Sequence, residues 1–203
     1  MLSFKSLAFV AAVAFGAFST AFAAPATSSE LVARDVRGVA AIIADLHVNI
    51  SPSILQLNSV VKANATVEVI TPIVLNLKSV IADAVVEVIN LTNAAPTTIL
   101  ATADGTAQVT VSVLASIIGD LLIFVFGALN VVLNVCDVSV VSALIPVLCI
   151  VADILGCLIC AIFSLCGGLL VGLVGAVATI VVSIGPIITR LSITVLISLL
   201  VKL

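Results

Sequence analysis

The first half of the chain repeats its apolar residues at spacings of three and four, which is the pattern of a helix with one buried face. Three segments carry this pattern, with apolar positions running over 32–46, 54–65 and 77–91. Ser51–Pro52 has the form of an N-cap followed by proline at the first helical position, and Pro72 is expected to end one helix and begin another. Strands are the rival prediction because valine and isoleucine favour them. The spacing favours helices.

The second half of the chain is apolar on nearly every side of its predicted helices. The runs 109–135, 138–165 and 168–203 each exceed the roughly 20 residues that a helix needs to cross a bilayer. Pro146 and Pro186 are expected to kink or interrupt two of these runs. Gly168, Gly172 and Gly175 share roughly one helical face, which predicts close approach of another backbone, either in a helix pair or in a tight core.

These patterns predict an all-α protein, with amphipathic helices in the first half followed by a bundle of long, very apolar helices. Composition separates the two halves. The chain is 63% hydrophobic and 8% charged, far from an ordinary soluble domain, and it has no lysine or arginine from Ser79 to Thr189. The composition changes near Asp104–Gly105, so we expect a polar region at 24–105 and a strongly apolar, cysteine-containing region at 106–203.

The N-terminus has the features of a secretory signal peptide. Lys5 precedes an apolar stretch over 7–18, and Ala21-Phe22-Ala23 has the small-residue pattern of a cleavage site. The sequence therefore predicts a signal peptide at 1–23 and a secreted protein. An uncleaved membrane anchor is the alternative, although the apolar stretch is short for a membrane span.

Three asparagines begin N-glycosylation triplets: Asn49-Ile50-Ser51, Asn64-Ala65-Thr66 and Asn90-Leu91-Thr92. The first triplet is weakened by the proline that follows it. We expect Asn64 and Asn90 to be modified, with chance occurrence of the triplets as the alternative. All three lie in the more polar region, which is expected to face water.

All five cysteines fall within one short stretch, at Cys136, Cys149, Cys157, Cys160 and Cys166. In an oxidising compartment such clustering predicts disulfides, and the odd number leaves one thiol for an intermolecular bond or for burial. The pairing stays open, and buried thiols acting as small hydrophobic residues are the alternative. Cys157 and Cys160 form a Cys-x-x-Cys pair, but no βαβ pattern surrounds it and no second pair or histidine completes a zinc site.

The sequence predicts no enzymatic activity, no catalytic or metal-binding residue and no cofactor. His47 is the only histidine, so the chain has very little from which to build a nucleophile activated by a base. The net charge of −3 and a pI near 4.8 argue against nucleic acid as a partner.

The alanine- and phenylalanine-rich signal, the hexapeptide Leu-Val-Ala-Arg-Asp-Val at 31–36 and the order of a polar and then an apolar half form a familiar layout. The layout resembles the Schizophyllum-type small secreted hyphal-surface proteins of mushroom-forming fungi. This resemblance implies association with the cell wall or matrix and a role in aerial hyphae and attachment. True hydrophobins look different, with eight cysteines that include two adjacent pairs.

The sequence therefore predicts a secreted, surface-active structural protein of the cell wall or matrix. Its apolar C-terminal half is expected to adsorb to hydrophobic interfaces or to self-associate. A multi-pass membrane protein of the secretory pathway is one alternative, and an extracellular lipid-binding protein with an internal cavity is another. Asp120 lies near the middle of an apolar run, where a carboxylate at the bilayer centre costs about 2.5–3.5 kcal/mol, and this counts against the membrane alternative.

Overall fold

The computed structural model describes residues 37–190, which belong to one compact unit. The expected signal peptide at 1–23, the hexapeptide at 31–36 and the end of the last apolar run at 191–203 lie outside the described residues. The long helices are α2 (Val39–Asn58), α3 (Val67–Asn90), α5 (Val111–Val135), α6 (Val138–Cys166) and α7 (Leu173–Arg190). Apart from one isolated bridge between Ala101 and Gln108, residues 37–190 contain no β-structure, so the all-α prediction is confirmed.

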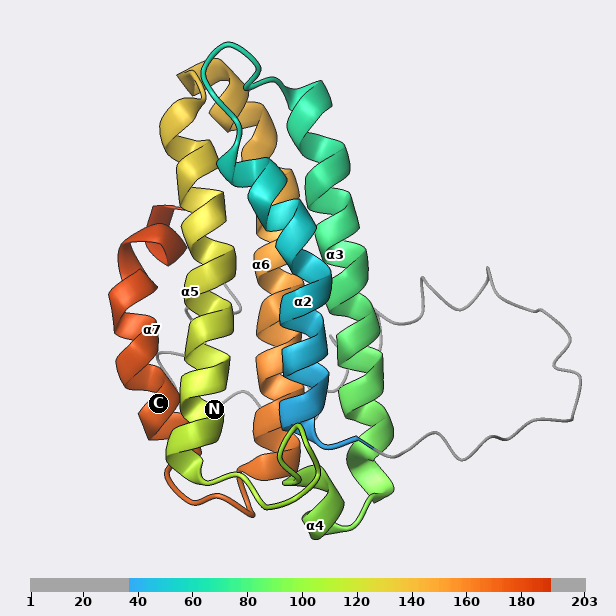
Figure 1. The fold of residues 1–203 in the computed structure, drawn as a ribbon. Helices are drawn as coiled ribbons and strands as arrows, with labels where there is room; N and C mark the ends of the chain where they lie inside the picture. The colour runs from blue at the N-terminus through green and yellow to red at the C-terminus, as the bar shows by residue number, and fades with distance from the viewer. Residues whose placement is uncertain (1–36, 191–203) are drawn as a thin grey trace, which may run out of the picture. The chain divides into compact units, whose positions relative to one another are not determined.

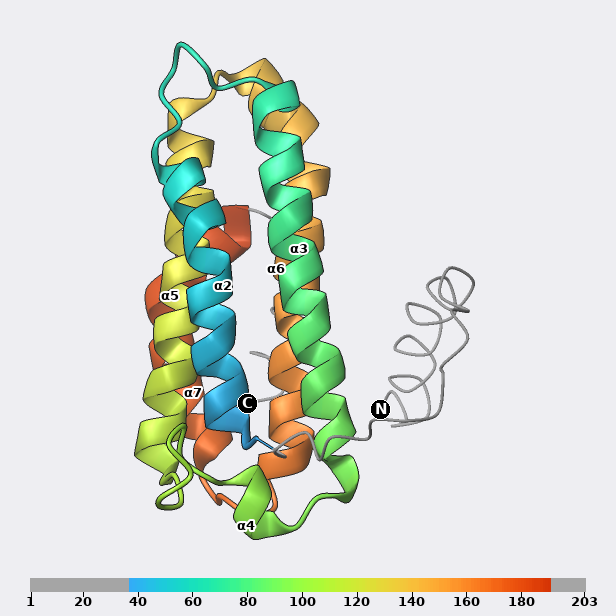
Figure 2. The same cartoon turned by 45° about the vertical axis from the view of Figure 1, so that its right-hand side comes forward.

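Four of these helices, α2, α3, α5 and α6, form a bundle. Some helices that are not consecutive in the sequence pack side by side in it. α2 packs on both α3 and α5, and α6 packs mainly on α3, so α2 and α6 stand at opposite corners. Figures 1 and 2 show α2 and α5 running in one direction, with α3 and α6 running together in the other. α7 packs along the outer side of α5.

The connection from α3 to α5 crosses one end of the bundle, because these two helices occupy opposite corners. It contains the 3-10 turn η1 (Leu91–Asn93), the short helix α4 (Pro96–Ile99) and a tight turn in which Gly105 has a positive φ of 71°. The start of α2 rests on this connection. A Cβ atom on Gly38 would lie 2.7 Å from the carbonyl oxygens of Thr98 and Ala101, so only glycine allows this approach.

The core is shared by helices from both sides of Asp104–Gly105. Ile43 and Leu46 from α2, Leu77 from α3 and Phe126 from α5 are among the largest side chains removed from solvent, and they belong to one apolar cluster that α6 and α7 also enter. Burying such a side chain stabilises the fold by about 1.5–3 kcal/mol. The composition change near Asp104 therefore falls in a connecting loop within one compact unit.

Within residues 37–190, no long helix ends at a proline. α2 continues through Pro52, α3 through Pro72, α6 through Pro146 and α7 through Pro186, so the breaks predicted at Ser51–Pro52 and at Pro72 are wrong. All four prolines are exposed. Each proline frees the carbonyl one turn before it, and on the outer side of a helix water can bond that carbonyl.

The break between the first two long helices lies instead at 59–66, where polar side chains bond to the nearby backbone. The hydroxyl of Ser59 donates to the carbonyl of Gln56 (2.7 Å), and Oδ1 of Asn64 accepts from the amide of Val61 (2.8 Å). Such local bonds compete with continued helix. Thr66 then adopts extended backbone before α3 begins.

Candidate functional site

Most polar side chains of the long helices lie on the outside of the bundle, although Asp153 in α6 is partly buried and the hydroxyl of Thr71 in α3 is buried without a hydrogen-bond partner among the described residues. In the described core one polar residue is buried, Ser53, and its hydroxyl accepts a bond of 3.0 Å from the side-chain amide of Asn76. Ser116, Asp120 and Asn134 all lie exposed on α5. Membrane bundles usually turn ionisable groups inward, away from lipid. The exposed Asp120 differs from that usual arrangement.

Large apolar side chains interrupt this polar surface, and together they form what we call the apolar exterior. The most exposed are Val171 (88%), Val138 (83%), Val182 (70%), Val48 (68%) and Leu55 (67%). Half of the set lies before Asp104 and half after it. Surface hydrophobicity therefore comes from both regions of the chain, although the composition of the second is much more apolar. Its members are Val48, Leu55, Val61, Val69, Leu75, Val86, Ile89, Val113, Ile123, Val138, Ile150, Leu169, Val171 and Val182.

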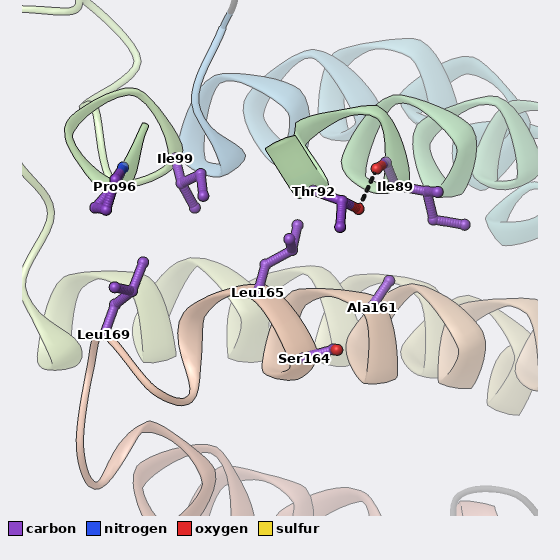
Figure 3. A pocket seen from close by; sticks show the side chains of 8 residues that line it. All are labelled: Ile89, Thr92, Pro96, Ile99, Ala161, Ser164, Leu165 and Leu169. Carbon is purple, nitrogen blue, oxygen red and sulfur yellow. Dashed lines mark hydrogen bonds between the residues drawn. The ribbon is translucent and has the colours of Figure 1, made fainter. Parts of the chain in front are cut away.

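A shallow apolar hollow lies where the end of α3, α4 and the end of α6 meet (Figure 3). Its volume is about 330 Å³, and its described lining contains no charged side chain. Leu165 and Leu169 point from α6 and the following loop toward Thr92 and Ile99. The hydroxyl of Thr92 donates to the carbonyl of Ile89. The lining residues are Ile89, Thr92, Pro96, Ile99, Ala161, Ser164, Leu165 and Leu169.

A second hollow, of about 390 Å³, lies between α2 and α3 and is lined by carboxylates. Arg37 donates to Asp45 and, at 3.3 Å, to Glu87, and so it joins the two walls by partly exposed ion pairs. Among residues 37–190 no group of three histidine, cysteine or acidic side chains is arranged to hold a metal ion. The lining residues are Ile42, Asp45, Leu46, Asn49, Val80, Asp83, Ala84 and Glu87.

The two favoured glycosylation sites lie at opposite ends of α3. Asn64 is exposed in the loop before this helix, and Asn90 is its exposed last residue. A helix of 24 residues is about 36 Å long, so the two sites stand at the two ends of the bundle. Asn49 is exposed in the middle of α2, beside the acidic hollow.

The five cysteines all carry thiols in this structure, and four of them lie on α6. Cys157 is exposed, and Cys166 is buried. Burial raises the pKa of the Cys166 thiol to about 11. Burial and the nearby charge of Asp153 raise the pKa of both Cys149 and Cys157, while burial raises the pKa of Asp153 itself. The pKa values of Cys149, Cys157 and Cys166 therefore all lie above that of an ordinary thiol.

The predicted close packing at three glycines is wrong for the described residues. Gly168 and Gly172 lie in the turn between α6 and α7, and an added Cβ on either, or on Gly175 in α7, would meet no atom within 4 Å. The close approach is at Gly119 on α5. A Cβ there would lie 2.7 Å from side-chain atoms of Ile180 on α7. The run that forms α5 contains two glycines, Gly119 and Gly127, and its sequence does not indicate which of them meets another helix.

His47 joins α2 to α5 through an aromatic stack that the sequence pattern did not predict. Its ring lies 4.3 Å from the ring of Phe124, with an angle of 18° between the planes. The two residues stand far apart in sequence, so no local spacing indicates the contact. It gives the only histidine a packing role between two parallel helices.

The length and hydropathy of the helices are compatible with a membrane location. Four described helices, α2, α3, α5 and α6, are long and apolar enough to cross a bilayer. The chain matches no known protein family, no characterised protein and no solved structure.

Proposed function

We propose that this chain is a secreted, surface-active structural protein of the cell wall or extracellular matrix, which adsorbs to hydrophobic interfaces through its apolar exterior. One observation carries the proposal: exposed charged and amide groups share the bundle surface with large exposed apolar side chains, over a core that is already filled. A protein of this kind is soluble enough to be exported, and it lowers its free energy by covering its exterior. The resemblance to hyphal-surface proteins supports the same role.

The apolar exterior is large enough to drive adsorption. Val48, Leu55 and Val182 each leave about two-thirds of their surface exposed. Covering one of them at an interface gains about 1–2 kcal/mol, taken from the value for full burial of such a side chain. Association also costs translational and rotational entropy. Several contacts made together offset this cost, so attachment strengthens with the number of side chains covered.

The second candidate function, a multi-pass membrane protein, rests on the length and hydropathy of α2, α3, α5 and α6. In that arrangement the outward face of α5 would place Asp120 and Asn134 against lipid. A carboxylate near the bilayer centre costs about 2.5–3.5 kcal/mol. The outward polar groups thus favour the secreted protein.

Glycosylation at the two ends of α3 distinguishes the two candidates. Sugar is added only on the lumenal side of the secretory membrane, so Asn64 and Asn90 can both be modified only if α3 does not cross it. We expect peptide mass spectrometry of the expressed protein to find glycans at both sites, and Asn64→Gln and Asn90→Gln to remove one glycan each. Modification at one end only, with recovery solely in detergent, would support the membrane protein.

Adsorption itself is measured by surface tension at an air–water interface. The double variant Val48→Ser/Leu55→Ser removes two exposed apolar side chains from α2 and should slow the fall in surface tension. Ala44→Ser is the matched control, because it makes an exposed residue of the same helix more polar without removing a large apolar group. Equal adsorption by the double variant and the control would show that this part of the exterior does not act.

A further inference from the structure

One apolar side of α7 joins this helix to the bundle. α7 packs mainly on α5 and makes only a minor contact with α6. Its buried residues recur at spacings of four, four, three and four, which places them on one side of the helix. The opposite side is exposed and carries Gly175, Thr179 and Val182. The buried residues are Leu173, Val177, Val181, Ile184 and Ile188.

The side of α5 beneath α7 is also apolar. Ala115, Gly119, Leu122 and Phe126 follow one another at spacings of four, three and four, and all are buried. Gly119 identifies this side as the one under α7, because a Cβ there would touch Ile180. α2 packs on another side of α5 (Figure 1). If α7 moved away, α5 would therefore keep its place in the four-helix bundle.

The turn between α6 and α7 has the features of a hinge. Gly172 in this turn has a φ of 92°, which glycine adopts without strain. An added Cβ on Gly168 or Gly172 would meet no atom within 4 Å, so packing does not fix the turn at these positions. Val171 beside them is 88% exposed. Hinges are short segments of this kind, in which a few residues absorb a change in backbone direction.

A hydrophobic boundary changes the balance between a closed and an opened α7. In water, separation of α7 from α5 would expose two apolar faces at once, so the closed arrangement is favoured. At an air–water or oil–water boundary, these faces leave water whether they pack on each other or lie on the boundary. Opening then loses little apolar burial and adds both faces to the adsorbed surface. Because the boundary binds the opened state better, it shifts the population toward that state.

We propose that α7 is a hinged helix, which turns about residues 167–172, opens from α5 at a hydrophobic boundary and lies flat on it. This inference rests on the proposed surface activity, and it assigns part of that activity to apolar faces that the closed protein hides. The bundle of α2, α3, α5 and α6 stays packed. α7 carries no charged residue before Arg190, its last residue, so little charge opposes its adsorption. Helices with one apolar face bind boundaries more strongly as they bury more apolar area.

A reversible lock between α5 and α7 tests the movement. In Gly119→Cys/Ile180→Cys the two Cβ atoms would stand 3.4 Å apart, close to the range of about 3.5–4.5 Å found in disulfides. Peptide mass spectrometry identifies the bridge in the full mature chain. We expect the bridged chain to lower the surface tension of water more slowly, and to a smaller extent, than the same chain after dithiothreitol. Gly119→Cys alone and Ile180→Cys alone control for the native thiols and should show no such difference.

The outcomes separate this inference from the proposed function. Equal adsorption by the bridged and the reduced chain overturns the hinge, even though the protein is surface-active. A wild-type chain that does not lower surface tension contradicts the proposed function and the hinge with it. Ile43→Val in the bridged chain loosens the four-helix core but leaves the bridge in place. It should not restore adsorption, and restoration would attribute adsorption to general unfolding and overturn the hinge.

Two identical substitutions on opposite sides of α7 test the hinge without a bridge. Val177 is buried, whereas Val182 is 70% exposed. Val177→Ala weakens the contact with α5, so the opened state is populated more often and surface tension should begin to fall sooner than with the wild-type chain. Val182→Ala is the matched control and should bring no earlier fall. Circular dichroism checks that both variants stay helical. An unchanged or later fall with Val177→Ala would contradict the proposal.

Discussion

The contact between α5 and α7 rests on the absence of a side chain at Gly119, and an added methyl group tests it. In Gly119→Ala the new Cβ would lie 2.7 Å from Cδ1 and Cγ2 of Ile180 and 3.4 Å from its Cβ. Isoleucine is branched at Cβ and has few rotamers in a helix, so it cannot turn away freely. Overpacking of this kind costs about 1–3 kcal/mol.

Part of this cost is offset, because alanine favours a helix over glycine by about 1 kcal/mol. We therefore expect Gly119→Ala to lower the free energy of unfolding by about 0–2 kcal/mol. Gly127→Ala is the matched control on the same helix, since its Cβ would meet no atom within 4 Å. The control should raise the free energy of unfolding by about 0.5–1 kcal/mol. Urea unfolding followed by circular dichroism measures both variants.

The double variant Gly119→Ala/Ile180→Ala identifies the source of the cost. If the new methyl group presses on Ile180, the effect of Gly119→Ala should become favourable once the isoleucine is shortened, giving a coupling energy of about 0.5–3 kcal/mol. The reasoning is refuted if Gly119→Ala stabilises the wild-type chain as much as Gly127→Ala does, since α7 would then not approach α5 at this point.

Three further predictions concern charge and protonation. Asp153→Asn removes one of the two causes that raise the pKa of Cys157, so the pH profile of its alkylation by iodoacetamide should move to lower pH; an unchanged profile would contradict this. Burial raises the pKa of Cys166 from 9.0 to about 11, so the folded state keeps a proton that the unfolded chain releases, and stability should fall as pH rises through that window. Cys166→Ala should lose less stability there in urea titrations at several pH values. Lys62 and Asp137 form an exposed pair at 3.0 Å, so Lys62→Ala should cost less than about 1 kcal/mol by urea unfolding, and high salt should erase the difference.

The helices themselves could be predicted from the sequence because each buries a face with regular spacing. The apolar runs expected at 109–135 and 138–165 correspond closely to α5 (Val111–Val135) and α6 (Val138–Cys166). The ends within the first half could not be predicted from proline, since exposed Pro52 and Pro72 are tolerated inside helices. The decisive bonds, such as that of Asn64 to the amide of Val61, depend on side-chain geometry that spacing does not show.

The surface was harder to predict, because exposure depends on which helices become neighbours. Composition indicated an apolar exterior confined to the second half, yet Val48 and Leu55 on α2 are among its most exposed members. α5 is the reverse case: much of its apolar surface is covered by α2 and α7, which leaves Asp120 outward. Which side chains are exposed depends on which helices pack together, including helices that are far apart in the sequence. Local sequence patterns do not show which helices pack together.

The diagonal connection between α3 and α5 has a consequence for how the protein is made. α2 and α3 leave the ribosome before α5 and α6. In the folded protein α2 packs against α5, and α3 packs against α6. The hairpin of α2 and α3 therefore emerges with the apolar faces that contact α5 and α6 exposed. These faces are not both covered until α6 has been synthesised. On the proposed secretion, we expect export of this chain to depend on chaperones that bind the exposed apolar faces of α2 and α3.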